Sequence, residues 1–270
     1  QTGAIRDMIQ SHLFQILAFA AMEPPTDYTP EHIRNEKVKV IDALVPTPAD
    51  RVAEFCALGQ YGPDGKDDLG FASSEGVAPG STTETFAALE FQFQNWRWAG
   101  TPFYLRSGKR LAKKRTEVVV QFKPPAANLF RKLPAFAGGD HLVPNRLVFT
   151  VAPHERLSLR FETKRPGLGI NIDPLEMMAD VGASFDAPVV EAYGPLMIDA
   201  MRGDQTLFKS RTEVESAWDA VMPFLGEASA GARSGIRDNY QPGSWGPDSA
   251  KALLARKGRR WYEDDVAAGS

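Results

Sequence analysis

The sequence has little cysteine, no long apolar run and no large excess of charge. Its single cysteine, Cys56, cannot build a disulfide framework, so we expect a reducing, cytoplasmic location. No apolar run approaches the ~18 residues of a membrane-spanning helix, and we therefore expect no membrane partner. The formal net charge is -3 over 270 residues, so we expect no nucleic-acid partner.

The sequence also lacks two familiar classes of site. No Gly-x-Gly-x-x-Gly stretch follows a predicted strand and no Walker-type loop is present, so this segment predicts no such nucleotide-binding loop. His32, His141 and His154 have no metal-ligand spacing with acidic residues or with Cys56, so no metal site is expected. A helical pattern is already running a few residues after Gln1, and we interpret the chain as one cut at a domain edge.

Apolar residues recur at helical spacing in several segments. Ile5, Ile9, Leu13 and Leu17 do so in the first of them, and Pro24 then ends the pattern because proline cannot continue a helix. The predicted helices cover residues 3–21, 49–58, 189–201, 212–225 and 249–256. The fourth begins with a capping-box spacing over residues 212–215. The glycine-rich segment 59–82 is predicted to be a long surface loop.

Near residue 85 the period of the apolar pattern changes to two, which is typical of strands. The predicted strands cover residues 85–93, 102–106, 117–123, 146–152, 157–163 and 175–181. Short turns join several of them, so neighbouring strands should be antiparallel. The predicted class is therefore α+β, with a large, mostly antiparallel sheet of six or more strands and helices packed on one face.

The first candidate for chemistry is the pair Asp7 and His12. Histidine titrates near neutral pH and can act as a general base, and an aspartate can accept hydrogen bonds from hydroxyl groups. On an α-helix the two side chains would lie roughly 140° apart around the axis and about 7.5 Å along it. They would not pair, but they could flank one ligand. The alternative is that His12 is a core histidine close to Met8 and Phe19.

The second candidate is a basic segment between two predicted strands, residues 106–115. It carries six cations in ten residues, among them Lys109 and Lys114. Such a cluster suits a phosphate or another polyanion. The alternative is a solvated hairpin tip with no ligand.

Several stretches together resemble the glucose-6-phosphate dehydrogenase family. They occur in family order and cover nearly the whole chain. The stretches are Ile5–Leu13, Ala21–Pro25, Thr83–Phe86, Asn95–Leu111, Pro144–Val148, Met201–Phe208 and Gly243–Pro247. The Asn-Trp-Arg-Trp-Ala-Gly and Arg-Gly-Asp-Gln-Thr-Leu-Phe segments within them are the most specific.

The resemblance implies that residues 1–270 form a carboxyl-terminal substrate-binding and dimerisation domain. Such an enzyme oxidises D-glucose 6-phosphate to 6-phospho-D-glucono-1,5-lactone with transfer of a hydride to NADP, the first step of the pentose phosphate pathway. By the same resemblance His12 is the general base, and Asp7, Lys109 and Lys114 bind glucose 6-phosphate. NADP would be bound mainly by a Rossmann domain upstream, and the expected assembly is a homodimer or homotetramer through the sheet.

Two departures from the family pattern stand out. Ser11 replaces the asparagine that usually precedes the histidine, and little effect is expected. Thr150, Met178 and Trp245 stand where some eukaryotic members use charged residues to bind a second, structural NADP, so no such site is expected here. The alternative function is a non-catalytic dimerisation or regulatory module derived from the family. Retention of all four site residues favours the enzyme.

Overall fold

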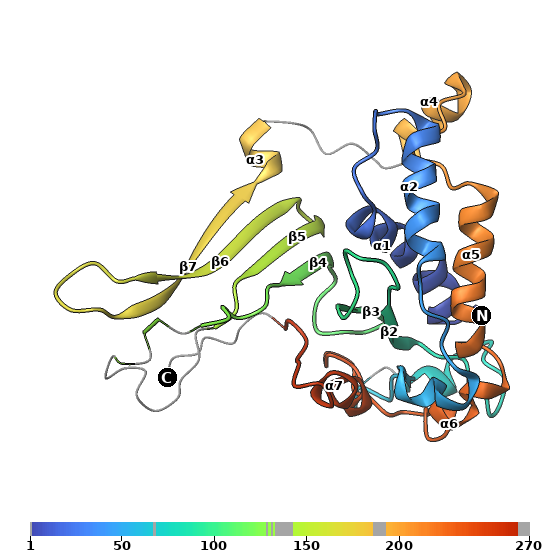
Figure 1. Ribbon diagram of the computed structural model, residues 1–270. Helices are drawn as coiled ribbons and strands as arrows, with labels where there is room; N and C mark the ends of the chain where they lie inside the picture. Colours follow the sequence, from blue (N-terminus) through green and yellow to red (C-terminus); the bar gives the residue numbers. More distant parts are fainter. Residues whose placement is uncertain are drawn as a thin grey trace. The chain divides into compact units, whose positions relative to one another are not determined.

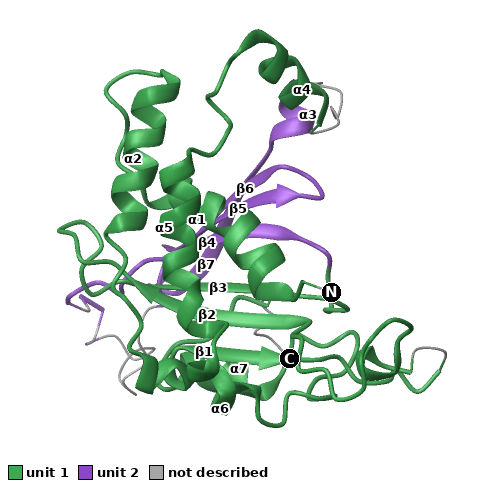
Figure 2. Ribbon diagram, turned by 90° about the vertical axis from the view of Figure 1, so that its right-hand side faces the viewer, with its two compact units in different colours: residues 1–113, 192–270 green, residues 114–191 purple. Residues whose placement is uncertain are grey.

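Seven strands in the described residues form two antiparallel sheets (Figure 1). The computed structural model describes residues 2–66, 69–127, 129, 130, 132, 143–185 and 193–263. These divide into two compact units, coloured separately in Figure 2: the first comprises Gln1–Lys113 and Ala192–Ser270, and the second Lys114–Glu191. The first unit holds a sheet of order β1-β2-β3, and the second a sheet of order β4-β5-β6-β7.

The sheet of the first unit is buried on both faces. Its strands are β1 (Cys56–Gly59), β2 (Phe86–Gln92) and β3 (Pro102–Gly108). Alternate residues of β2 point to opposite faces, so Ala87, Leu89 and Phe91 join one core cluster while Phe86 and Ala88 join another. The sequence of the central strand is therefore a nearly continuous apolar run, as expected of a strand that is buried on both faces.

Helices of the first unit cover both faces of this sheet. The helices of the unit are η1 (Ile5–Leu13), α1 (Phe14–Ala21), α2 (Pro30–Asp42), α4 (Tyr193–Arg202), α5 (Arg211–Val221), α6 (Ala230–Arg233) and α7 (Asp248–Ala255), with the 3-10 turns η2 (Ala49–Glu54), η3 (Phe71–Ser73), η5 (Met222–Phe224) and η6 (Glu227–Ser229). Among them, α4 buries no residue. α2 contacts both α1 and α5, and η1 contacts β3 (Figures 1 and 2). On the other face α7 contacts β1 and contributes Ala250, Leu253 and Leu254 to the second cluster.

The second unit is a four-stranded meander. Its elements are β4 (Thr116–Gln121), β5 (Arg146–Ala152), β6 (Arg156–Lys164), β7 (Ile172–Asp180) and the short helix α3 (Val181–Phe185). Each strand pairs antiparallel with the next. Residues directly opposite one another share a face, so Phe149 of β5, Leu157 of β6 and Ala179 of β7 lie in one row.

The α+β class and the antiparallel strands are confirmed, although the described strands divide into two sheets where we expected one. The predicted helix over 49–58 is wrong at its second half, because Cys56 begins the buried strand β1. A short apolar run of this kind fits a strand as well as a helix. The sequence also gave no prediction of α2, which begins at the N-cap Thr29 with Pro30 in its first turn.

Two further helix starts differ from the prediction. α5 begins one residue before Thr212, and its N-cap is Ser210, whose hydroxyl accepts the Glu213 N–H at 3.1 Å. The capping pair is therefore Ser210 and Glu213, not the spacing over 212–215. Within its described part, the helix predicted over 189–201 begins at Tyr193; its first residues lie outside the described ranges. No helix among the residues that the structure describes is long and apolar enough to cross a membrane.

Candidate active site

The helix that carries Asp7 and His12 is π-helical, not α-helical. η1 closes its turns between residues five apart, and its last turn runs from the Phe14 N–H to the Ile9 carbonyl oxygen. A turn of about five residues brings side chains at that spacing close to one side of the helix. Asp7 and His12 therefore share a face of η1, which corrects the angle of ~140° expected for an α-helix.

Both of these side chains face outward. Ile5 and Ile9, on the other side of η1, are fully buried in the core, whereas Asp7 and His12 are exposed. Neither has a hydrogen-bond partner among the described residues. The alternative interpretation of His12 as a core histidine is wrong for this reason. The Asp7 carboxylate and the His12 imidazole thus lie together on an exposed surface of η1.

Lys109 lies directly after β3, on a loop whose backbone is held on both sides. Its N–H donates to the Thr85 carbonyl oxygen at 2.9 Å, and its own carbonyl oxygen accepts the Tyr240 hydroxyl at 2.8 Å. The next residue, Arg110, has a positive φ of 57°, and its carbonyl oxygen accepts the Gly243 N–H at 2.8 Å. The side chain of Lys109 is exposed. A fixed backbone with an open ammonium favours a positioned group over a solvated hairpin tip.

Glu84 and Thr85 connect this loop to η1. Glu84 is 4% exposed; its backbone oxygen accepts the Ala4 N–H at 2.9 Å, and its carboxylate accepts the Ile5 N–H at 3.1 Å. A carboxylate at this end also suits the positive end of a helix dipole. Because Thr85 bonds the Lys109 N–H, neighbouring residues fix the start of η1 and the base of the lysine loop. Sequence reasoning placed Glu84 only within a family motif and gave it no role.

A second support for η1 comes from Lys209, which the sequence did not single out. Its ammonium donates a hydrogen bond to the carbonyl oxygen of Ser11, the residue before His12. Burial lowers the pKa of Lys209, while the nearby Glu213 carboxylate acts in the opposite direction. The backbone next to His12 is thus held by the residue that precedes Ser210, the N-cap of α5.

Lys114, the fourth predicted residue, is the first residue of the second unit. Its side chain is exposed. The following residue, Arg115, pairs with Glu117 at 3.0 Å and both are largely buried. Three of the four predicted site residues therefore belong to the first unit, and Lys114 belongs to the second.

A protein-family profile matches nearly the whole chain. The family is described as "Glucose-6-phosphate dehydrogenase, C-terminal domain", and the match covers residues 1–262. This chain belongs to that family. The matched range contains Asp7, His12, Lys109 and Lys114, and it confirms the resemblance stated from the sequence motifs.

Relatives of this glucose-6-phosphate dehydrogenase domain are longer than the chain. A glucose-6-phosphate 1-dehydrogenase of Mycolicibacterium smegmatis is 41% identical over 264 residues, which cover 97% of this chain and 52% of that protein. One of Bacillus subtilis is 37% identical over 265 residues, covering 97% and 53%. The chain spans about half the length of these relatives.

Solved structures show the same fold. A glucose-6-phosphate dehydrogenase in complex with its substrate glucose-6-phosphate has a TM-score of 0.82 and 31% sequence identity, covering 96% of this chain and 51% of that one. A glucose-6-phosphate 1-dehydrogenase from Mycobacterium avium has a TM-score of 0.77 and 31% identity, covering 97% and 51%. These likenesses confirm the α+β fold of the dehydrogenase domain.

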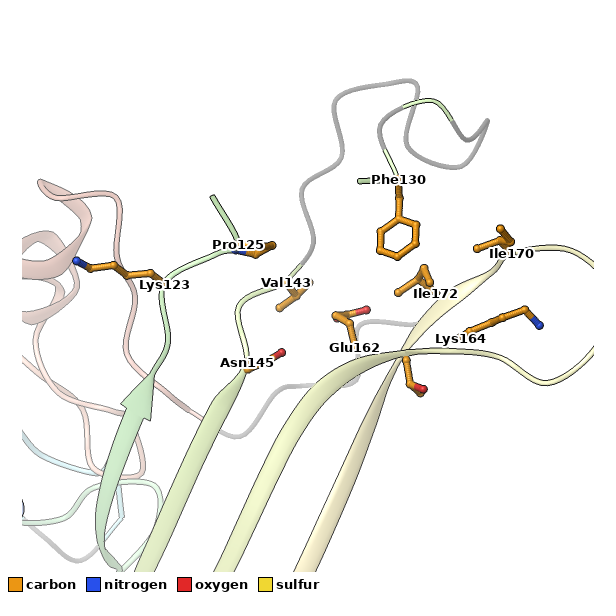
Figure 3. A pocket seen from close by; sticks show the side chains of 10 residues that line it. Lys123, Pro125, Phe130, Val143, Asn145, Glu162, Lys164, Ile170 and Ile172 are labelled. Atoms are coloured by element: carbon orange, nitrogen blue, oxygen red, sulfur yellow. The ribbon is translucent and has the colours of Figure 1, made fainter. Parts of the chain in front are cut away.

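The second unit of the dehydrogenase domain contains a cavity of about 720 Å³ (Figure 3). It is lined by Lys123, Pro125, Phe130, Val143, Asn145, Glu162, Thr163, Lys164, Ile170 and Ile172. None of the four predicted site residues lines it, and none lines a groove of about 1060 Å³ at the start of α2. Within the described ranges no three His, Cys, Asp or Glu side chains gather as a metal site, and His141 lies outside those ranges.

Proposed function

We propose that this chain supplies the general base and part of the substrate site of a cytoplasmic glucose-6-phosphate dehydrogenase. That enzyme oxidises D-glucose 6-phosphate to 6-phospho-D-glucono-1,5-lactone, with NADP as the hydride acceptor. The observation that carries the proposal is the shared face of Asp7 and His12 on η1, tied through Glu84 and Thr85 to the Lys109 loop. Residues 1–270 then act as one substrate-binding and dimerisation domain.

His12 takes the proton in this reaction. Oxidation at C1 removes a hydride from carbon and a proton from the C1 hydroxyl, so that a C=O bond forms. The imidazole of His12 stands on an open face, and the unprotonated ring nitrogen of a neutral imidazole can receive that proton. Asp7 lies on the same face and accepts a hydrogen bond from a sugar hydroxyl, which orients the substrate toward His12.

Lys109 and Lys114 bind the anionic part of the substrate. Both ammonium groups are exposed and lie within a segment of six cations, residues 106–115. Charge-assisted hydrogen bonds from cations to phosphate oxygens are roughly twice as strong as neutral ones. The two lysines therefore contribute to binding in the ground state and the transition state alike.

The described residues do not form a Rossmann-type binding site for the NADP dinucleotide. Every strand pair in the two sheets is antiparallel, whereas a Rossmann site needs a parallel β-α-β unit with a glycine-rich turn. The relatives extend over about twice the length of this chain. We assign the cofactor to that additional segment and the proton transfer to this chain.

The sheet of the second unit provides the dimerisation surface. One face carries a group of apolar residues from neighbouring strands, namely Val118, Val120, Leu147, Phe149, Leu157, Leu159, Phe161, Leu175 and Met177. The polar pair Thr163 and Asp173 lies at the end of this face. Phe149 is 44% exposed and Met177 is 58% exposed. Contiguous exposed apolar surface of this kind marks interaction sites, and the occupant we propose is the same face of a second copy.

The test of the catalytic role is His12→Asn in the full-length enzyme, meaning this chain together with the preceding half that its relatives have. Asparagine keeps a hydrogen bond to the sugar hydroxyl but cannot accept the proton. Loss of a general base lowers the rate by about 10²–10⁴-fold, so kcat should fall by that factor. Lys114→Ala should instead raise KM for glucose 6-phosphate more than it lowers kcat.

His32→Asn is the matched control, because His32 lies on α2, where it pairs with Asp27. Its kinetic constants should equal those of the unaltered enzyme. If His12→Asn raised KM and left kcat intact, His12 would be a binding residue and the base would lie elsewhere. If neither His12→Asn nor Lys114→Ala changed the kinetics, the non-catalytic module would be the better description.

A further inference from the structure

Tyr240 is a buried tyrosine far along the chain from any predicted site residue. It is 4% exposed, and its ring packs against Phe86 and Tyr61 at centroid distances of 5.6 and 6.5 Å. Its hydroxyl nevertheless reaches out of this apolar cluster and donates to the carbonyl oxygen of Lys109 at 2.8 Å. The ring fixes the direction of the hydroxyl, and the hydroxyl in turn fixes the lysine backbone.

The Tyr240 hydroxyl belongs to a series of hydrogen bonds that runs from Tyr61 through Thr85 to Lys109. The Tyr61 N–H donates to the Thr85 hydroxyl oxygen at 3.1 Å, and that hydroxyl lies 2.9 Å from the Tyr240 hydroxyl oxygen. With Tyr240 donating onward to Lys109, the Thr85 hydroxyl is the donor to Tyr240. Successive hydrogen bonds of this type polarise and strengthen one another. A tyrosine phenol is protonated, and so able to donate, at neutral pH, and burial raises the pKa of Tyr240 further, to about 12.

The residues that follow Tyr240 hold the rest of the loop. Gly243 donates its N–H to the Arg110 carbonyl oxygen at 2.8 Å, and Ala112 donates its N–H to the Ser244 carbonyl oxygen at 2.8 Å. Segment 240–244 therefore runs along the lysine loop and makes one contact at each of three successive points. Only Tyr240 does so through a side chain, so only its contact can be removed by a single conservative substitution.

We infer that Tyr240 is a positioning residue, which sets the place of the Lys109 ammonium by holding the Lys109 carbonyl oxygen. The inference rests on the proposed substrate role of Lys109. Tyr240 itself touches no substrate; it keeps the loop in the geometry that substrate binding needs, so that binding does not have to order the loop.

The experiment measures steady-state kinetics and thermal unfolding of the full-length enzyme for Tyr240→Phe, Lys109→Ala and the double variant. Tyr240→Phe keeps the ring and loses only the hydroxyl. Loss of one such hydrogen bond should raise KM for glucose 6-phosphate by about three- to tenfold and leave kcat unchanged. Tyr28→Phe is the matched control, since Tyr28 is 81% exposed and lies outside this cluster; its kinetics should not change.

The double variant separates positioning from a general structural role. If Tyr240 acts through Lys109, then Tyr240→Phe should add nothing to the KM of Lys109→Ala. An equal KM increase in both backgrounds, or a fall in kcat with KM unchanged, would overturn the inference. If Lys109→Ala raises KM but Tyr240→Phe does not, only the positioning role fails. If Lys109→Ala leaves KM unchanged, the proposed substrate role of Lys109 fails, and the role of Tyr240 fails with it.

Discussion

Removing one partner of the buried ion pair between Lys37 and Glu213 should destabilise the first unit strongly. The two side chains are 0% and 1% exposed, and Lys37 Nζ lies 3.0 Å from Glu213 Oε2. Gln15 completes the network: its side-chain oxygen accepts from Lys37 Nζ at 2.9 Å, and its amide donates to Glu213. One polar network therefore joins α2 and α5 to α1, the helix that directly follows η1.

The loss of unfolding free energy depends on which charged group stays buried after the substitution. Lys37→Met keeps an unbranched apolar stem but leaves the Glu213 carboxylate buried without its cation, which typically costs about 3–5 kcal/mol. Lys209 is close enough to interact with Glu213 and offsets part of this loss, so we expect about 3 kcal/mol. The double variant Lys37→Met, Glu213→Leu leaves no unpaired charge and should recover most of the lost stability.

Urea unfolding of the purified chain, followed by far-UV circular dichroism and tryptophan fluorescence, measures these differences. Lys39→Met is the matched control, because Lys39 lies on the same helix but is 69% exposed, where it pairs with Glu36; its effect should be small. Equal losses from Lys37→Met and Lys39→Met would refute the reasoning. So would a double variant that is less stable than Lys37→Met alone.

Four further predictions concern other parts of the molecule. Met177→Lys, on the apolar sheet face, should turn a dimer into a monomer by light scattering, whereas Met178→Lys, on the opposite face, should not. Gly246→Ala should lower the unfolding temperature, because φ at Gly246 is +107° and an added Cβ would meet the Phe86 ring. The raised pKa of Tyr240, about 12, means that the unfolded chain loses its phenolic proton first. The free energy of unfolding should therefore fall as pH rises from about 10 to 12, and Tyr240→Phe should reduce that slope. Lys209→Met should lower kcat by roughly tenfold, because the backbone beside His12 loses its support; an unchanged kcat would show that this support is dispensable.

The strands could be predicted well from the sequence because local pattern decides them. In β6 the apolar residues Leu157, Leu159 and Phe161 alternate with polar ones, and the observed bounds of β5 (Arg146–Ala152) and β6 (Arg156–Lys164) lie within one residue of the prediction. The prediction for Cys56–Gly59 was wrong because all four residues are buried and therefore show no alternation of apolar and polar residues. Their state depends on pairing with β2, some thirty residues later in the chain, and periodicity carries no information on that pairing.

The supports of the candidate site could not be predicted, because each is a contact between distant residues. Glu84 meets Ile5 across 79 residues, and Tyr240 meets Lys109 across 131. A buried glutamate in a sequence looks the same whether it caps a helix or pairs with a lysine. Spacing gave Asp7 and His12 as candidates, whereas their roles and those of Lys109 and Lys114 came from the family resemblance. That resemblance implies which residues act on the substrate, but it says nothing about the residues that hold them in place.

The π-helical form of η1 depends both on the local sequence that carries Asp7 and His12 and on contacts with residues far along the chain. An α-helix would separate Asp7 and His12 around its axis, so one ligand could meet both only by lying across the helix. The wider turn places them on one face instead. Such a turn is less favourable than an α-helical one and is frequent at functional sites, and here both ends of it are held: Glu84 bonds its start and Lys209 bonds the carbonyl oxygen of Ser11 near its end. The geometry of the pair is thus a property of the tertiary contacts, and a change in either contact should alter catalysis before it unfolds the chain.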